Sequence, residues 1–417
     1  MRIGFLSTRL AGLDGVSLET AKWAAMLRRL GHEVFYCAGE LDAQGPPGVE
    51  DPLFHFQHPY VQALQRRFFA PEGDADPASL RAALETLARQ LERRIAEFVD
   101  RFRIDVLIVE NALAIPMHLA LGMATTWFLA RSGMPAIGHH HDFYWERERF
   151  AHPRWPELLE AYFPPTLPNL KHVVINRAAQ RALQARKGVS SVVIPNVMDF
   201  RQGPPRHNGV SLRDYLGLSP EDLLILQPTR VVPRKGIEWS LELLHYLQQP
   251  QWQRKLGRRR PVLVVSHPAG DEGLAYLRQL RSQARRLGVP FLYIAPLVGE
   301  RPGRGPRFTL WDVYFQADGV TYPSRYEGFG NALLEGVYCK QPLLVNLYPI
   351  YREEIRPQGF RFVEMDHRVT PEVVEGFVEH VMNPRVRWET VEHNYQVAAR
   401  VYAYENVMPL LEDLLRF

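Results

Sequence analysis

Two successive runs of alternating strand and helix patterns constrain the fold of this chain more than any other feature. In the first half, an apolar segment at residues 2–7 is followed by a helical pattern over 17–30 and a second apolar segment at 31–37. After a turn-rich stretch at 196–207, the alternation restarts at 223–227. Strands that alternate with helices form parallel sheets covered by helices. The sequence therefore predicts an α/β protein with two Rossmann-like, doubly wound domains.

The predicted domains divide the chain into three ranges. We expect an N-terminal domain over 1–195, a second domain over 196–387 and a C-terminal helical segment over 388–417 that returns to the first domain. Ligands of open α/β sheets bind beyond the carboxyl ends of the strands, so we expect the two domains to face a ligand cleft. Further strands are expected at 106–109, 135–139, 171–176, 191–194, 262–266, 291–294, 319–322 and 342–346.

Composition excludes several classes of protein. Apolar residues make up 46% and charged residues 23% of the chain, which is the balance of folded proteins rather than disordered ones. Fifty Lys and Arg against 46 Asp and Glu leave a net charge of only +4, so we expect no nucleic-acid partner. Cys37 and Cys339 are too few and too distant for a disulfide framework, and the N-terminus lacks a secretory pattern. We therefore expect a cytoplasmic protein.

A membrane span is the alternative interpretation of one segment. Residues 112–130 carry no formal charge, which approaches the length that a spanning helix needs. The run nevertheless contains Pro116, Gly122 and two threonines, and it follows an apolar strand pattern that ends at Asn111. A buried helix fits this context better than a membrane span.

The strongest site signal is a glycine turn between a strand and a helix in the second half. The turn Glu-Gly-Phe-Gly begins at Glu327, and the helix begins near Asn331. Free backbone N–H groups at a helix start attract anions, so a diphosphate could bind at Phe329, Gly330 and Asn331. Glu335, one turn later, could bind a ribose hydroxyl, and Glu327 could face a sugar. Alternatively, both carboxylates are ordinary helix and surface charges.

Two cations lie in the same half of the chain, after a buried strand. Arg230 and Lys235 are five residues apart beside a predicted turn. A guanidinium and an ammonium group both suit phosphate oxygens. Such a pair alone would be interpreted as surface charge, but its presence beside the glycine turn favours a phosphate site.

Polar residues in the first half could bind a second substrate. His139, His140, His141 and Asp142 leave a strand at its carboxyl end. Successive strand residues point to opposite faces, so we expect no metal site from these histidines. Further candidates for binding an acceptor follow the same segment or an earlier strand; they are Glu146, Arg147, Glu110 and Asn111, the last of which could instead cap a helix.

The second half resembles the nucleotide-sugar-binding domain of retaining family 4 glycosyltransferases with the GT-B fold. The resemblance rests on Glu327 and Glu335 at the family's spacing and on Arg230 with Lys235 before them. Residues 194–199, Ile-Pro-Asn-Val-Met-Asp, are similar to the family's Ile-Pro-Asn-Gly-Val-Asp at the domain junction. The first half has the family's opening strand, glycine loop and Gly-His-Glu-Val strand, so the resemblance covers nearly the whole chain.

The resemblance implies roles for residues of the first half. The glycine loop with Gly15 would contact donor phosphates or the acceptor, and His141 would contact the donor sugar, with His139 as the competing assignment. Where the family often has a Gly-Gly turn leading to a Glu, residues 346–354 read Asn-Leu-Tyr-Pro-Ile-Tyr-Arg-Glu-Glu. That variant resembles a branch whose members make mannosylglucosylglycerate-type solutes.

The implied function is that of a retaining hexosyltransferase. It would move a hexose from GDP-mannose or UDP-glucose to a small polar or anionic acceptor, such as a sugar or glycerate derivative, with no cofactor or metal needed for the chemistry. The implied catalytic residues are His141, Arg230, Lys235 and Glu327. Two alternatives stay open: a peripheral membrane glycosyltransferase with a lipid-linked acceptor, and a non-catalytic sugar-nucleotide-binding protein. The sequence does not indicate an oligomeric state.

Overall fold

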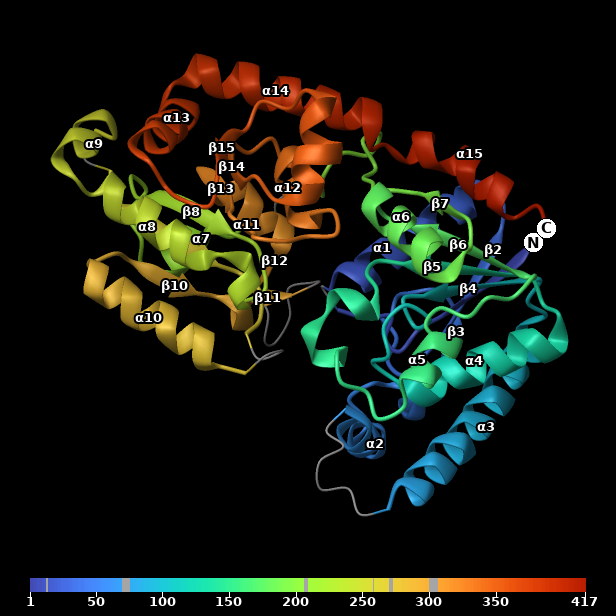
Figure 1. The fold of residues 1–417 in the computed structure, drawn as a ribbon. Helices are drawn as coiled ribbons and strands as arrows, with labels where there is room; N and C mark the ends of the chain where they lie inside the picture. The colour runs from blue at the N-terminus through green and yellow to red at the C-terminus, as the bar shows by residue number, and fades with distance from the viewer. Residues whose placement is uncertain (13, 70–75, 206–208, 258, 270–272, 300–306) are drawn as a thin grey trace. The chain divides into compact units, whose positions relative to one another are not determined.

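The computed structural model describes residues 1–12, 14–69, 76–205, 209–257, 259–269, 273–299 and 307–417 (Figure 1). Parts of the predicted linker at 196–207 and of the glycine loop before Gly15 lie outside these ranges. The chain forms two compact units. Unit 1 comprises Met1–Asn196 with Glu405–Phe417, and unit 2 comprises Val197–Tyr404.

The C-terminal segment is divided between the two units. Helix α14 (Pro384–Val401) belongs to unit 2, whereas nearly all of α15 (Tyr404–Leu414) belongs to unit 1. The predicted range 388–417 therefore differs from the observed division, because α14 ends at Val401, inside that range, and a separate helix follows. The boundary between the first two ranges lies within one residue of the predicted position.

Unit 1 is built on a seven-stranded parallel sheet with the order β3-β2-β1-β4-β5-β6-β7. Strands β1, β2, β4 and β5 are short apolar runs buried along almost their whole length, as the sequence predicts. The structure adds β3, a partly exposed strand of three residues that carries no clear apolar pattern. The strands are β1 (Arg2–Leu6), β2 (Glu33–Ala38), β3 (Gly48–Glu50), β4 (Val106–Glu110), β5 (Ala136–His140), β6 (Leu170–Val174) and β7 (Ser191–Val193).

Helices flank this sheet and supply the core of unit 1. The helices are α1 (Gly15–Arg29), α2 (Pro59–Phe69), α3 (Pro77–Phe102), α4 (Leu119–Ser132), α5 (Pro156–Tyr162) and α6 (Arg177–Lys187). Leucines of α3 and α4 pack with side chains of β4 in one buried cluster. Helix α4 is buried around most of its circumference, which explains the uncharged run. Among the described residues, no helix is both long and apolar enough to cross a membrane.

Unit 2 contains a six-stranded parallel sheet with the order β10-β9-β8-β13-β14-β15, and a separate two-stranded sheet of β11 and β12. These strands are β8 (Leu223–Gln227), β9 (Pro261–Val265), β10 (Phe291–Tyr293), β11 (Val298–Gly299), β12 (Phe308–Thr309), β13 (Gly319–Tyr322), β14 (Leu343–Asn346) and β15 (Val363–Met365). The helices besides α14 are α7 (Leu212–Tyr215), α8 (Ile237–Leu247), α9 (Pro250–Lys255), α10 (Ala275–Leu287), α11 (Leu310–Gln316), α12 (Asn331–Tyr338) and α13 (Pro371–Met382). Two parallel sheets flanked by helices confirm the α/β class.

Candidate functional site

A buried ion cluster lies beyond the carboxyl ends of β8 and β13 in unit 2. Lys235 ends a short 3-10 helix after β8, and Glu327 lies in the turn after β13. The Lys235 Nζ atom donates a hydrogen bond to Glu327 Oε1. Arg234 Nη1 donates to Glu327 Oε2 at 3.0 Å and to the Tyr326 carbonyl at 3.1 Å. The predicted residues Lys235 and Glu327 therefore meet, and Arg234 completes the cluster.

Burial and opposite charge set the ionisation of this cluster. Burial alone raises the pKa of Glu327, but the facing Lys235 and Arg234 charges outweigh it and lower the pKa to about 2. Burial lowers the pKa of Lys235 to about 8, against the attraction of Glu327. Both groups are therefore ionised at neutral pH. Two cations facing one carboxylate leave a surplus of positive charge, which suits a diphosphate.

Arg230 and His267 lie near Lys235 in the same unit. The Arg230 charge opposes protonation of Lys235 and of His267, which places all three side chains within electrostatic reach of one another. His267 follows β9 and is 9% exposed, and burial lowers its pKa to about 4. The sequence analysis did not single out Arg234 or His267. The sequence offered one clue to each residue. Arg234 is adjacent to Lys235, and His267 follows β9, which neighbours β8 in the sheet.

The glycine turn has the geometry that the sequence predicts. Helix α12 begins at Asn331, and the preceding Gly330 has a φ of 126°. A Cβ atom at Gly330 would lie 2.8 Å from the Tyr348 hydroxyl oxygen, so any side chain there would clash. That hydroxyl donates a hydrogen bond of 2.6 Å to the carbonyl of Phe329, whose side chain is buried. These contacts fix the conformation of the turn that leads into the N-terminus of α12.

Glu335 is a buried residue rather than a surface charge. It lies one turn into α12 with an exposed fraction of 4%. The Tyr314 hydroxyl lies 3.0 Å from Glu335 Oε2 and is able to donate to it. A carboxylate held inside the unit by a tyrosine is a fixed acceptor, which is what binding of a ribose hydroxyl requires.

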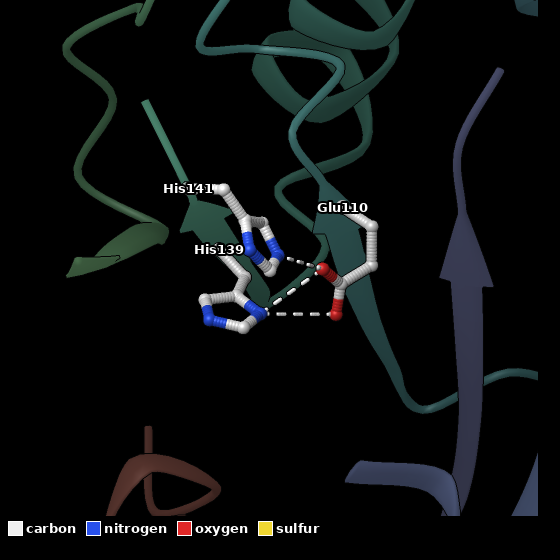
Figure 2. A group of neighbouring side chains, drawn as sticks. All are labelled: Glu110, His139 and His141. Carbon is white, nitrogen blue, oxygen red and sulfur yellow. Dashed lines mark hydrogen bonds and ion pairs between the residues drawn. The ribbon is translucent and has the colours of Figure 1, made fainter. Parts of the chain in front are cut away.

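A second buried carboxylate, Glu110, lies between two histidines in unit 1 (Figure 2). Glu110 ends β4 and pairs in register with His139 on the neighbouring β5. His139 Nδ1 lies 3.2 and 3.0 Å from the two carboxylate oxygens of Glu110, and His141 Nε2 lies 3.2 Å from Oε2. The side chains of Glu110, His139 and His141 are 0%, 1% and 10% exposed.

The pKa values of the two histidines shift in opposite directions because their surroundings differ. Burial raises the pKa of Glu110, but the two imidazoles outweigh it and lower the pKa to about 2. Burial lowers the pKa of His139 despite the attraction of Glu110. Burial also lowers the pKa of His141, but the hydrogen bond and charge of Glu110, together with the charges of Glu19 and Asp142, outweigh burial and raise it. Of the two imidazoles, that of His141 therefore holds a proton more readily.

The spacing of Glu110, His139 and His141 bears on the prediction that these histidines form no metal site. Their ligand atoms lie within 4.8 Å of one another, a spacing that would admit a metal ion. Only His140 points to the opposite face, where its Nε2 lies 3.0 Å from His172 Nδ1. The expectation that the histidines cannot converge is thus wrong for His139 and His141, which are two residues apart and share a face. The imidazole nitrogens already face both oxygens of Glu110 at hydrogen-bond distance.

Asn111 is not a helix cap, because α4 begins at Leu119 and is capped by His118. Asn111 adopts a left-handed conformation with a φ of 56°. Its Oδ1 accepts a hydrogen bond of 3.0 Å from the His141 backbone N–H, and its Nδ2 donates one of 3.0 Å to Asp142 Oδ1. Asn111 therefore fixes the backbone of His141.

Of the remaining residues predicted to bind an acceptor, Asp142 and Arg147 pair with each other, and Glu146 bonds to a backbone N–H group of the same loop. Asp142 forms an ion pair with Arg147. Glu146 Oε2 accepts a 3.1 Å hydrogen bond from the Phe143 backbone N–H, and burial raises the pKa of Glu146 to about 7. These contacts order the loop after β5, and Glu146 is poised to gain or lose a proton near neutral pH.

Gly15 is the first residue of α1, whose N-terminus is capped by Asp14. Asp14 Oδ1 accepts hydrogen bonds of 3.1 Å from the N–H groups of Val16 and Ser17. Arg9 in turn pairs with Asp14 at 2.9 Å. A phosphate at this helix start would compete with Asp14 for these N–H groups.

Sequence comparison identifies the family. The chain is 33% identical over 442 aligned residues to the mannosylglucosylglycerate synthase of Thermotoga maritima, and the alignment covers 100% of this chain and 99% of that protein. The chain belongs to the mannosylglucosylglycerate synthase family. It is 33% identical to the synthase of Petrotoga mobilis over 379 residues, which is 88% of this chain and 86% of that protein. As a member of this family of GT-B glycosyltransferases, the protein is a hexosyltransferase. No protein-family profile matches the chain.

Solved structures show the same fold. Anabaena HepE in complex with UDP and glucose aligns with a TM-score of 0.67 at 16% identity, over 100% of this chain and 99% of that one. The sucrose-phosphate synthase of Thermosynechococcus elongatus aligns with a TM-score of 0.68 at 13% identity, over 100% and 98%. At these identities the likeness confirms the GT-B fold of this family member and nothing more specific.

Proposed function

We propose that this protein transfers a mannosyl group from a nucleoside diphosphate sugar to glucosylglycerate, with retention at the anomeric carbon. The names of the two full-length relatives support the product, a glycerate that carries glucose and mannose. GDP-mannose is then the expected donor, and UDP-glucose is the other candidate. The observation that carries the transfer chemistry is the surplus positive charge of Arg234 and Lys235 around the single carboxylate of Glu327.

The leaving group determines what the unit 2 cluster does. When the bond from the sugar C1 to the diphosphate oxygen breaks, negative charge develops on the diphosphate, and fixed cations that face it lower the barrier. Lys235 and Arg230 take that role, assisted by backbone N–H groups of Phe329, Gly330 and Asn331. Glu327 keeps Lys235 in place and accepts hydrogen bonds from sugar hydroxyls. Glu335 accepts a hydrogen bond from the ribose.

Unit 1 supplies the groups for the sugar and the acceptor. His141 donates a hydrogen bond to the hexose, with its backbone held by Asn111. The acceptor hydroxyl attacks C1 on the face that the diphosphate leaves, and its proton passes to the departing phosphate oxygen. Arg147 and Glu146, in the ordered loop after β5, contact the acceptor.

Thermal unfolding with a panel of GDP-, UDP- and ADP-sugars is the first test, because a ligand that binds only the native state raises the midpoint. We expect GDP-mannose to give the largest shift. Incubation of GDP-mannose with glucosylglycerate should then yield a disaccharide-glycerate whose new linkage is α by its anomeric NMR coupling. Formation of a β linkage would contradict retention. A shift with a donor but no transfer to glucosylglycerate, glycerate or a lipid-linked sugar would favour a non-catalytic binding protein.

A further inference from the structure

The Glu110 carboxylate is inaccessible to an acceptor in this structure. Its side chain is fully buried, and its two oxygens face His139 and His141 at 3.0 to 3.2 Å. The sequence analysis placed Glu110 among residues that bind the acceptor, but with a side chain that is 0% exposed neither of its oxygens is open to a ligand. The side chain that is partly open is His141.

We propose that Glu110 is a positioning residue that holds His141 as an imidazolium, with Nε2–H directed at the carboxylate and Nδ1–H directed away from it. In Figure 2 the second ring nitrogen of His141 lies on the side away from Glu110. That N–H is a charge-assisted donor for a sugar or phosphate oxygen. The proposal rests on the proposed function, in which His141 contacts the donor.

His139 explains why the proton stays on His141. The His139 ring stacks on Trp23 with centroids 4.1 Å apart, and its buried Nε2 has no hydrogen-bond partner among the described residues. A neutral ring that donates Nδ1–H to Glu110 leaves only a lone pair at Nε2. A charged ring would leave an unpaired N–H there, which costs more to bury. His139 therefore shares the carboxylate as a neutral donor.

The charged groups around His141 also favour its protonated form. Glu110 faces it from β4, and the carboxylates of Glu19 from α1 and Asp142 from its own loop add negative charge. Glu19 is itself paired with Lys22 at 3.0 Å, and Asp142 with Arg147, so Glu110 is the principal anion that acts on the ring.

The substitution Glu110→Gln separates this role from a structural one. A carboxamide keeps the shape but removes the charge, so burial then dominates and the pKa of His141 should fall below its ordinary 6.5. A donor that must be protonated is lost as pH rises through its pKa. The alkaline limb of the kcat profile should therefore move to lower pH by at least one unit. At about pH 7.5 this is a loss of about tenfold or more, with partial recovery near pH 6.

The direct measurement is an imidazole titration by 15N NMR on the full chain, with His141 assigned from a His141→Gln sample. In the wild type, we expect His141 to titrate above 6.5 and His139 to stay neutral. Glu110→Asp should restore most of the shift that Glu110→Gln removes. His140→Gln, on the opposite face of the same strand, is the matched control and should leave the His141 titration unchanged.

Three results would overturn the proposal. One is a wild-type His141 that titrates below 6.5, which needs no variant to fold. The second is an equal loss of kcat at every pH in Glu110→Gln with an unchanged titration. The third is a stoichiometric metal in the purified protein that Glu110→Gln lacks. The titration does not depend on turnover, so absence of activity with every donor would count against the proposed function and leave this test intact.

Discussion

The two units each bury one carboxylate between two nitrogen bases, but the bases differ in kind. In unit 2, Glu327 faces Arg234 and Lys235; in unit 1, Glu110 faces His139 and His141. Nearby positive charge lowers the pKa of each carboxylate to about 2 despite burial. Each also follows or ends a strand of a parallel sheet. A buried carboxylate is thus stabilised by arginine and lysine in unit 2 and by histidines in unit 1.

The two clusters differ in whether their positive charge depends on pH, and this difference indicates which ligand group each one suits. Arginine is always charged and lysine is charged up to its pKa, so the unit 2 cluster carries excess positive charge throughout the neutral range. Histidine titrates near neutrality, so the charge of the unit 1 cluster depends on the proton at His141. A fixed positive field suits a diphosphate, whereas an adjustable one suits a single hydrogen bond to a sugar.

The largest effect is expected from Lys235→Ala, which removes one of the three cations, Arg230, Arg234 and Lys235, of the unit 2 cluster. We expect kcat to fall by about 10²–10³-fold, as for other groups that stabilise transition-state charge. The fold should persist, because Arg234 still pairs with Glu327 at 3.0 Å. Steady-state kinetics with circular dichroism checks both points. A variant that keeps full kcat would remove Lys235 from the mechanism.

Glu327→Gln tests whether the fixed cluster depends on its carboxylate. Lys235 would stay buried beside Arg234 without a counter-charge, and breaking a buried pair costs about 3–5 kcal/mol. Urea unfolding should show this loss at neutral pH. The double variant Lys235→Met with Glu327→Gln should recover stability but not activity. If the single variant is as stable as the wild type, the pair contributes no net stability.

The pH dependence of nucleotide affinity sharpens the contrast. Lys235, with a pKa of about 8, is protonated below that pH and loses its charge as pH rises through it. Binding of GDP should therefore be steady from about pH 6.5 to 7.5 and weaken by up to about tenfold by pH 9.5. Isothermal titration calorimetry measures this. Unchanged affinity over the whole range would mean that Lys235 does not face the diphosphate.

The smallest effect is expected at a second lysine, Lys255, which serves as the control. Lys255 pairs with Glu375 on the surface, and both side chains are 49% exposed. Surface pairs contribute about 0–1 kcal/mol, so Lys255→Ala should change unfolding free energy by less than about 0.5 kcal/mol. Its kcat should match that of the wild type. A large loss in Lys255→Ala would show that removing any lysine pair disturbs this protein.

The sequence predicts the strands that are apolar and long enough to show a pattern. Strands β1, β4, β8 and β9 are five-residue buried runs, and all four are expected from the sequence. Strands β7 and β10 have only three residues but are also expected, because each overlaps an apolar run that extends beyond it. The sequence does not predict β3, β11, β12 or β15, which have two or three residues and no apolar run of their own. Such short segments become strands through pairing with a neighbour, and their own composition carries little of that information.

The same distinction applies to the candidate site. Glu327, Gly330 and Glu335 form a local motif, so their spacing alone indicates a shared role. The partnership of Glu110 with His141 spans 31 positions and depends on the register between β4 and β5. The available signal was that consecutive strands of a parallel sheet are often neighbours, so residues at their carboxyl ends meet. Arg234 was missed because an arginine after a proline in a turn is indistinguishable from a surface charge.

Unit 1 is formed by two chain segments that are separated in the sequence by the whole of unit 2. Its last piece, Glu405–Phe417, is translated only after the whole of unit 2. In the finished protein the Lys171 ammonium, at β6, donates to the carbonyls of Leu414 and Arg416. The nascent first segment must therefore leave the ribosome with the partners of α15 uncovered. Unit 2 can complete its fold first, although its sequence comes second.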